Sequence, residues 1–162
     1  EPQCHLLFKK INFWGINPQL RYKLNQMINN KQRFMLFFPQ IPIMKSFAEQ
    51  LMKLYPTLKF VNVSSKDKQR LKKVQQFRDQ EVQAILTTTI LERGVTFKKI
   101  TVIVLEAQAK EFTKTTLIQI AGRAGRGKDS YDDEVHFYYQ YYTEQIRLAC
   151  AEIKYLNQQA KK

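Results

Sequence analysis

Short apolar runs alternate along the chain with longer segments in which apolar residues recur at helical spacing. The runs predict five strands, at residues 33–38, 59–63, 82–87, 100–105 and 135–139. The first run is continuously apolar after Arg33, which is typical of a strand buried on both faces. The helical spacings predict helices over residues 16–28, 43–54, 65–78, 115–124 and 142–156. Strands that alternate with helices in this way indicate a parallel α/β sheet.

The segment 65–78 carries the most detailed of these helix predictions. Ser65 suits the capping position, and the charge of Asp67 suits the positive end of a helix. A buried stripe is expected from three apolar residues at helical spacing, Leu71, Val74 and Phe77. The outer surface is then basic, with Lys66, Lys68, Arg70, Lys72, Lys73 and Arg78. At the end of the chain, residues 157–162 are expected to fray.

The composition is that of an ordinary globular domain. The chain has 162 residues, of which 44% are apolar and 25% charged, and this excludes a disordered chain, a collagen-like repeat and a coiled coil. No apolar run approaches the ~18 residues that a membrane span needs, so we expect no direct membrane insertion. The chain lacks a secretory signal and begins with Glu1. We interpret it as a piece of a longer protein or as a processed chain.

The net charge of +13 is unevenly distributed. Residues 1–80 carry 15 Lys and Arg against 4 Asp and Glu, whereas residues 81–162 carry 12 against 10. A strongly basic half indicates a polyanionic partner, of which nucleic acid is the commonest. A lysine-rich surface that serves only solubility is the alternative.

Cysteine and histidine give no indication of a metal site. Cys4 and Cys150 are far apart and have no neighbours at metal-ligand spacing. His136 lies within an apolar run, where a histidine on the face of a sheet is expected rather than a ligand. We therefore predict no metal ligands in this chain.

The segment from Gln119 to Arg126 is the most specific in the sequence and has two interpretations. As a helix, it places Gln119, Arg123 and Arg126 at i, i+4 and i+7 on one face, where two guanidinium groups suit a phosphate. The opposite side is then apolar, with Leu117, Ile120, Ala121 and Ala124. As a P-loop, residues 122–129 match G-x-x-x-x-G-K-[ST] except that Asp129 replaces the final hydroxyl residue. A P-loop opens into a helix, whereas turn-like residues and a strand follow here.

A second informative segment, residues 87–97, directly follows a predicted buried strand. It reads Thr-Thr-Thr-Ile-Leu-Glu-Arg-Gly-Val-Thr-Phe. Ligands of open parallel sheets bind beyond the carboxyl ends of the strands, where hydroxyls and backbone amides can hold phosphates. A threonine-rich strand end without a binding role is the alternative.

Together the two segments resemble motifs of superfamily 2 helicases. Thr88 to Gly94 is similar to the T-x-x-x-x-R-G of motif V, and Gln119 to Arg126 to the Q-x-x-G-R-x-G-R of motif VI. Arg33 to Gln40 stands where motif IV is expected. Within this superfamily, the chain resembles the late competence protein family ComFA, the ATP-driven motor of DNA uptake in naturally transformable bacteria. The primosomal helicase and the DEAD-box RNA helicases resemble it less, and Thr96 stands where DEAD-box proteins usually carry Asp.

The resemblance implies a fold and a division into two parts. The fold is a three-layer RecA-like domain with a mostly parallel central sheet flanked by helices. Residues 1–30 would be a linker segment with a helix, and residues 31–162 the helicase C-terminal domain. ATP and Mg²⁺ would be bound mainly by a first RecA-like domain that this chain does not contain, because its lysine loop and acidic box are not found here. The fragment alone is therefore expected to be inactive as an ATPase.

The resemblance also assigns roles to single residues. Arg126, assisted by Arg123, would be the arginine finger of ATP hydrolysis. Other contacts to the nucleotide would come from Gln119, Gly122, Glu92 and Gly94. Contacts to single-stranded DNA would come from Thr88, Thr89, Arg93 and Gln40.

The implied whole protein is a single-stranded DNA translocase of natural competence. Its partners would be the N-terminal RecA-like domain, single-stranded DNA and the DNA-uptake machinery at the membrane. The expected location is the cytoplasm, or peripherally the inner face of the membrane. The alternatives are a primosomal-type or RNA helicase domain, a non-catalytic basic module that binds nucleic acid, and a nucleotide-binding domain with its own P-loop.

Overall fold

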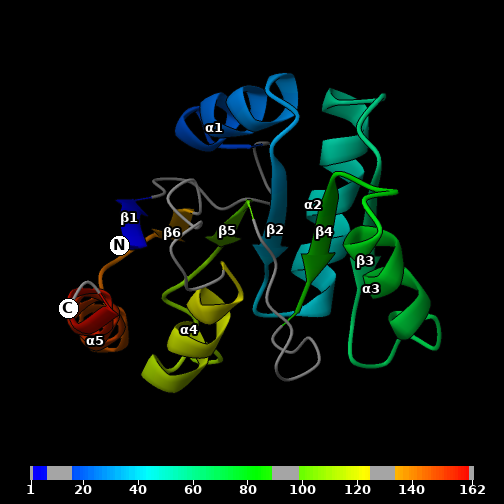
Figure 1. The fold of residues 1–162 in the computed structure, drawn as a ribbon. Coiled ribbons are helices and arrows are strands. Elements are labelled where there is room, and N and C mark those ends of the chain that lie inside the picture. Colours follow the sequence, from blue (N-terminus) through cyan, green and yellow to red (C-terminus); the bar gives the residue numbers. More distant parts are fainter. Residues whose placement is uncertain (1, 7–15, 89–98, 125–133, 161–162) are drawn as a thin grey trace.

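The computed structural model describes residues 2–6, 16–88, 99–124 and 134–160. Its centre is a sheet of six strands in the order β1-β6-β5-β2-β4-β3 (Figure 1). The strands are β1 (Pro2–Leu6), β2 (Arg33–Phe37), β3 (Phe60–Val63), β4 (Ala84–Thr87), β5 (Ile100–Val104) and β6 (Glu134–Tyr139). Every neighbouring pair is parallel. All five strands expected from the sequence are therefore confirmed, and β1 is an addition to them.

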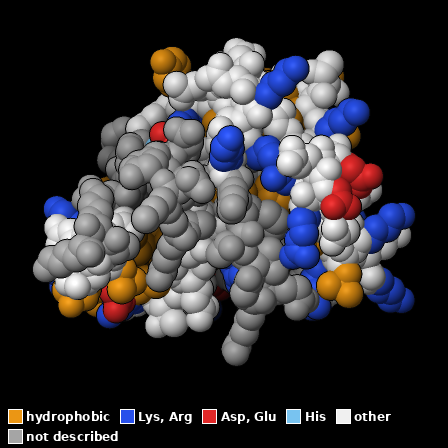
Figure 2. All heavy atoms as spheres, in the orientation of Figure 1, with side chains coloured by type: hydrophobic (Ala, Val, Ile, Leu, Met, Phe, Trp, Pro, Cys, Tyr) orange, Lys and Arg blue, Asp and Glu red, His pale blue; other side chains and the backbone are white. Residues whose placement is uncertain are grey.

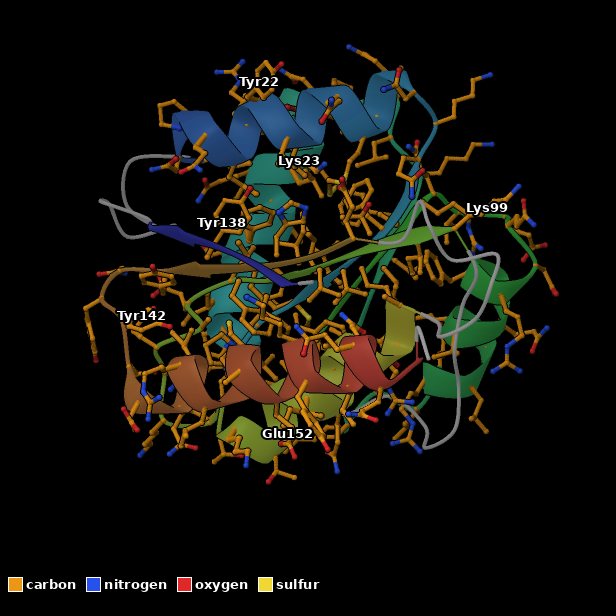
Figure 3. The ribbon with its side chains drawn as sticks, turned by 60° about the vertical axis from the view of Figure 1, so that its left-hand side comes forward. Tyr22, Lys23, Lys99, Tyr138, Tyr142 and Glu152 are labelled. Atoms are coloured by element: carbon orange, nitrogen blue, oxygen red, sulfur yellow. The ribbon has the colours of Figure 1, made fainter. Side chains whose placement is uncertain are left out.

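Helices cover both faces of the sheet. They are α1 (Pro18–Asn29), α2 (Ile41–Leu54), α3 (Arg70–Arg78), α4 (Lys114–Ala121) and α5 (Glu144–Ala160). Buried residues of α1 and α2 share one apolar cluster with the sheet, and those of α3, α4 and α5 share the other. Figure 3, which views the sheet nearly along its plane, shows α1 above it and α5 below. This is the three-layer α/β arrangement that the sequence predicts.

Strand β2 lies at the centre of this core, as its continuous apolar run predicts. Met35 and Phe37 face the cluster of α3, α4 and α5. Phe34 and Leu36 face the cluster of α1 and α2. All four side chains are at most 1% exposed, and full burial of such a side chain contributes roughly 1.5–3 kcal/mol. Because both faces are covered, the ends of β2 are fixed in position.

Two details of the helix predicted at 65–78 are wrong. Helix α3 begins at Arg70 after Gln69, so Ser65 does not cap it. Asp67 instead accepts a hydrogen bond from the Gln69 backbone at 2.8 Å, which makes a turn before the helix. Val74 and Phe77 are buried as predicted, but Leu71, in the first turn of α3, is 67% exposed.

The two ends of the chain are more ordered than the sequence suggests. Residues 157–160, expected to fray, continue helix α5. Strand β1 pairs with β6, with Pro2 opposite Val135 and Leu6 opposite Tyr139. Helix α1 contributes Leu20 and Leu24 to the core. The boundary between a linker segment 1–30 and a domain 31–162 stays a prediction.

Candidate functional site

The carboxyl ends of the parallel strands meet at one edge of the sheet, which we call the carboxyl edge. The backbone N–H of Phe38 donates to Thr87 O at 2.9 Å, and that of Leu105 donates to Phe37 O at 2.9 Å. These bonds hold the ends of β2, β4 and β5 together. Ligands of parallel α/β proteins bind at such an edge. The predicted contacts Thr88 and Gln40 both lie here, directly after β4 and shortly after β2.

Thr88 and Gln40 differ in how much they offer to a ligand. Thr88 is 8% exposed, so it is a nearly buried hydroxyl at the end of β4. Gln40 is exposed at the N-cap position just before α2, and its side-chain amide donates to the Glu111 carboxylate at 3.0 Å. Because Glu111 lies in the connection that follows β5, this bond joins the segments after β2 and β5. Gln40 is therefore held in place at the carboxyl edge.

The segment that carries the predicted arginines is helical as far as it is described. Helix α4 is capped by Thr113, whose hydroxyl oxygen accepts from the Thr116 N–H at 3.2 Å. After Ala121 the chain tightens into a 3₁₀ turn, η1 (Gly122–Ala124). The α-helix predicted to run through 115–124 is thus shorter than expected. Such tightening is common in the last turn of a helix.

The predicted two-sided character of this segment is confirmed in its described part. Leu117, Ile120 and Ala124 are buried against the sheet, and Ala121 packs on the same cluster. Gln119 is exposed, and Arg123 is half-buried. Burial lowers the pKa of the Arg123 guanidinium from its ordinary value, although the group stays protonated at any physiological pH. Arg123 therefore keeps its charge in a partly desolvated position.

Gly122 does not need the conformational freedom of glycine. Its φ of −65° and ψ of −14° are ordinary right-handed helical values. The cost of glycine in a helix is therefore not offset by an unusual backbone angle at this position. The remaining hypothesis is that another group approaches the Gly122 backbone closely, at the place that a larger side chain would fill.

Five predicted site residues lie outside the described residues: Arg126, Glu92, Gly94, Thr89 and Arg93. The greater part of the P-loop match, Gly125–Asp129, lies outside them as well. The roles of these residues stay predictions. The described residues bring together Thr88 and Gln40 at the carboxyl edge, and they place Gln119 and Arg123 on α4 and η1.

The structure adds a polar network that sequence reasoning missed. Glu106 follows β5, is 8% exposed and has a positive φ of 57°. The Gln140 side-chain amide donates to both of its carboxylate oxygens, at 2.8 and 2.9 Å, and the Gln108 amide donates to it as well. Gln108 in turn accepts from the Gln140 backbone at 3.0 Å. The network fastens the segment after β6 to the segment after β5. In the sequence, the one indication of this network is that Glu106 and Gln140 each directly follow a predicted strand.

The predicted basic surface of α3 is confirmed except at two residues, Arg70, which is half-buried, and Lys73. Figure 2 shows lysine and arginine side chains gathered over the side of the molecule where α3 lies. Lys66, Lys68, Lys72 and Arg78 are exposed. Lys73 is turned inward, where its ammonium group donates to the Asp67 carboxylate at 2.6 Å and to Asn62 O at 3.0 Å. The hydrogen bond from Lys73 is the main reason that the pKa of Asp67 lies below its usual value.

The opposite, amino edge of the sheet holds an open cavity of about 340 Å³ beside α1. Lys23 and Glu134 form an ion pair across it at 2.6 Å, and Figure 3 labels Lys23 together with Lys99, which also lines the cavity. Burial raises the pKa of Glu134, but the hydrogen bonds from Lys23 and His136 outweigh it and lower that pKa. His136 lies on the sheet as predicted. Among the described residues, no three His, Cys, Asp or Glu side chains are grouped to hold a metal ion.

Comparison with known families finds one domain family. Residues 19–128 match the helicase conserved C-terminal domain. The chain is 37% identical over 145 residues to the competence protein ComFA of Streptococcus pneumoniae (strain ATCC BAA-255 / R6), a match that covers 90% of this chain and 34% of that protein. It is 36% identical over 154 residues to ComFA of Bacillus subtilis (strain 168), covering 95% of this chain and 33% of that protein. The chain thus spans about a third of the length of these relatives.

Solved structures of helicase domains share the fold. The C-terminal domain of S. cerevisiae Dbp5 superposes with a TM-score of 0.63 at 13% identity, covering 96% of this chain and 84% of that one. The Pyrococcus furiosus Hef helicase domain superposes with a TM-score of 0.57 at 14% identity, covering 83% of this chain and 27% of that one. Identities this low show the fold alone. None of the helices in the described ranges is long and apolar enough to cross a membrane. By its sequence and its RecA-like fold, the chain belongs to the helicase conserved C-terminal domain family and is related to ComFA.

Proposed function

We propose that this chain is the second motor domain of an ATP-dependent single-stranded DNA translocase that drives DNA uptake in natural competence. The observation that carries the proposal is the position of Arg123. Its guanidinium is half-buried on η1, and the buried residues Leu117, Ile120 and Ala124 anchor the segment to the sheet. An arginine held in this way keeps a fixed charge that suits a phosphate group. The family membership and the similarity to ComFA support the motor assignment.

ATP would lie between this domain and an N-terminal RecA-like domain of the full-length protein. That first domain would bind most of the nucleotide and its Mg²⁺. From this chain, Arg126 would supply positive charge to the γ-phosphate, with Arg123 assisting and Gln119 sensing the phosphate. Glu92, Gly94 and Gly122 would complete the nucleotide contacts. The described donors fit this task, since a guanidinium and an exposed amide are both good partners for phosphate oxygens.

Single-stranded DNA would lie across the carboxyl edge. Thr88 and Gln40 would contribute neutral hydrogen-bonding groups to its backbone, and Thr89 and Arg93 would add contacts from the adjoining segment. Contacts of this kind carry no sequence information, as a translocase requires. Domain closure coupled to ATP hydrolysis would move the protein along the strand. At the inner face of the membrane, the DNA-uptake machinery would be its partner.

The arginine assignment is tested in the full-length protein by Arg126→Ala and Arg123→Ala. Loss of an arginine finger removes ~10³–10⁵-fold in rate, so Arg126→Ala should reduce DNA-stimulated ATP hydrolysis by about that factor. Arg123→Ala should also reduce the rate of ATP hydrolysis. Binding of single-stranded DNA should stay near normal in both variants. Arg147→Ala is the matched control, because Arg147 is exposed on α5 and pairs with Glu144.

Hydrolysis rates equal to that of Arg147→Ala would contradict the assignment. Loss of DNA binding with unchanged hydrolysis would instead favour a basic nucleic-acid-binding module. Stimulation by RNA but not by DNA would identify an RNA helicase domain.

A further inference from the structure

Two tyrosines after β6 are exposed to solvent. Tyr141 is 63% and Tyr142 53% exposed. Both lie between β6 and α5, at the carboxyl edge, and Figure 3 shows Tyr142 at the end of the sheet above the start of α5. Tyr138, on β6 itself, is 1% exposed and belongs to the core, whereas Tyr141 and Tyr142 keep more than half of their surface exposed.

The backbone that presents these rings is fastened on both sides. Before them, Gln140 is bound to Glu106 and Gln108, and the Ala107 N–H donates to Tyr138 O at 2.9 Å. After them, the Thr143 hydroxyl oxygen accepts from the Ile146 N–H at 3.2 Å. The ring of Tyr142 also packs on that of Tyr139, with centroids 5.5 Å apart. A partner that binds these rings therefore meets a surface that is already ordered, which lowers the entropic cost of binding.

The exposed tyrosines adjoin the predicted contacts to the nucleic-acid backbone. Along the sheet, β6 is followed by β5, β2 and β4, and parallel strands are ~4.8 Å apart. Strands β6 and β4, which precede the tyrosines and Thr88, are thus about 15 Å apart along the sheet, a span that a few nucleotides cover. The segment after β5 lies between them, carries the exposed Lys110, and is joined to Gln40 through Glu111.

We propose that Tyr141 and Tyr142 form a base-stacking platform for the unpaired bases of the single-stranded nucleic acid. The inference rests on the proposed function and deepens it, because Thr88 and Gln40 would hold only the sugar–phosphate backbone. Aromatic rings stack on every base, so a platform adds affinity without sequence preference. Of the carboxylates at the carboxyl edge, Glu144 is paired with Arg147, Glu106 is buried under the network, and Glu111 accepts the hydrogen bond from Gln40.

The test compares two oligonucleotides of equal length, an oligothymidylate and an abasic strand, on the full-length protein. The double variant Tyr141→Ala/Tyr142→Ala should bind the oligothymidylate about tenfold or more weakly than the unmodified protein, and the abasic strand equally well. Tyr141→Phe/Tyr142→Phe keeps the rings and should restore binding. Tyr155→Ala is the control, because Tyr155 is 58% exposed but lies on α5 away from the carboxyl edge.

Unchanged oligothymidylate binding by the alanine double variant would overturn the platform while leaving the proposed function intact. Equal losses for both strands would also overturn it, because abasic DNA has nothing to stack. If the unmodified protein binds neither strand, the proposed function itself fails. Circular dichroism and the melting temperature of each variant check that it is folded. If the double alanine variant is not folded, the single variants Tyr141→Ala and Tyr142→Ala make the same comparison, and each should weaken binding of the oligothymidylate but not of the abasic strand.

Discussion

His136 is the buried ionisable group whose environment is most fully described. It is 4% exposed on β6, and its Nε2 lies 3.2 Å from the Glu134 carboxylate. Burial lowers the pKa of His136, the hydrogen bond to Glu134 opposes that effect, and the positive charge of Lys23 adds to it. The net result is a pKa below 6.5 in the folded protein. The folded state therefore favours the neutral imidazole more strongly than the unfolded chain does.

This difference predicts a loss of stability in mild acid. Between the unfolded pKa of about 6.5 and the lower folded value, the unfolded chain binds a proton that the folded protein does not. The contribution of His136 is present above pH 6.5 and is lost as the pH falls through the folded pKa. His136→Gln should make the free energy of unfolding less dependent on pH between about 7 and 5, as measured by urea unfolding. An unchanged pH dependence in that range would show that His136 does not cause it.

At the scale of elements, the start of α3 depends on one ion pair. Lys73 joins the Asp67 turn to Asn62 O at the end region of β3, so a single ammonium group fixes both segments. The ion pair between Asp67 and Lys73 therefore helps to hold α3, and with it the basic surface, in position.

Asp67→Asn should weaken the ion pair with Lys73 without removing the turn, because the asparagine oxygen can still accept from the Gln69 N–H. We expect a loss of about 1 kcal/mol in the free energy of unfolding at neutral pH. The pKa of Asp67 is lowered, so its stabilisation is present above the ordinary value of about 3.9 and is lost as the pH falls below it. The difference between the two proteins should accordingly vanish in strong acid. Asp79→Asn, at the other end of α3, is the matched control.

The elements were predictable where local periodicity decides the structure. The buried strand β2 and the apolar side of α4 follow directly from the spacing of residues such as Phe34, Leu117 and Ile120. The errors arise where tertiary contacts decide. Ser65 is a good cap by its chemistry, but the Asp67 turn takes its place, and Leu71 is exposed. Strand β1 has no continuous apolar run, since its sequence is Pro-Gln-Cys-His-Leu, and it is defined by its pairing with β6.

The residues of the candidate site also divide into those that a local sequence pattern predicts and those that only tertiary contacts define. The two-sided helix that carries Gln119 and Arg123 follows from its period, and the order of the strands places Thr88 and Gln40 at one edge. The bond between Gln40 and Glu111 joins residues far apart in sequence, which no local pattern indicates. The exposure of Tyr141 and Tyr142 could not be predicted either, because the neighbouring Tyr138 is buried and Tyr139 is partly buried. Only the three-dimensional structure shows which tyrosines are exposed and which are not.

At the scale of the whole molecule, the charge of +13 predicts salt-sensitive binding of single-stranded DNA. The logarithm of the binding constant of the full-length protein should fall linearly with the logarithm of salt concentration, by about 0.7 per phosphate neutralised. A binding constant that does not change with salt would contradict phosphate contacts. Comparing Lys72→Glu on α3 with Lys154→Glu on α5 tells whether the basic surface of α3 takes part, because only a contacting lysine changes the slope.

The pairing of β1 with β6 has a consequence for synthesis of the protein on the ribosome. Pro2 and Val135 are partners in the sheet, yet they are made at opposite ends of this stretch of chain. At ~5–20 residues per second, β1 waits on the order of ten seconds after leaving the exit tunnel before its partner strand exists. Until then β1 has no place in the sheet, and the part from β2 to β5 must assemble without it.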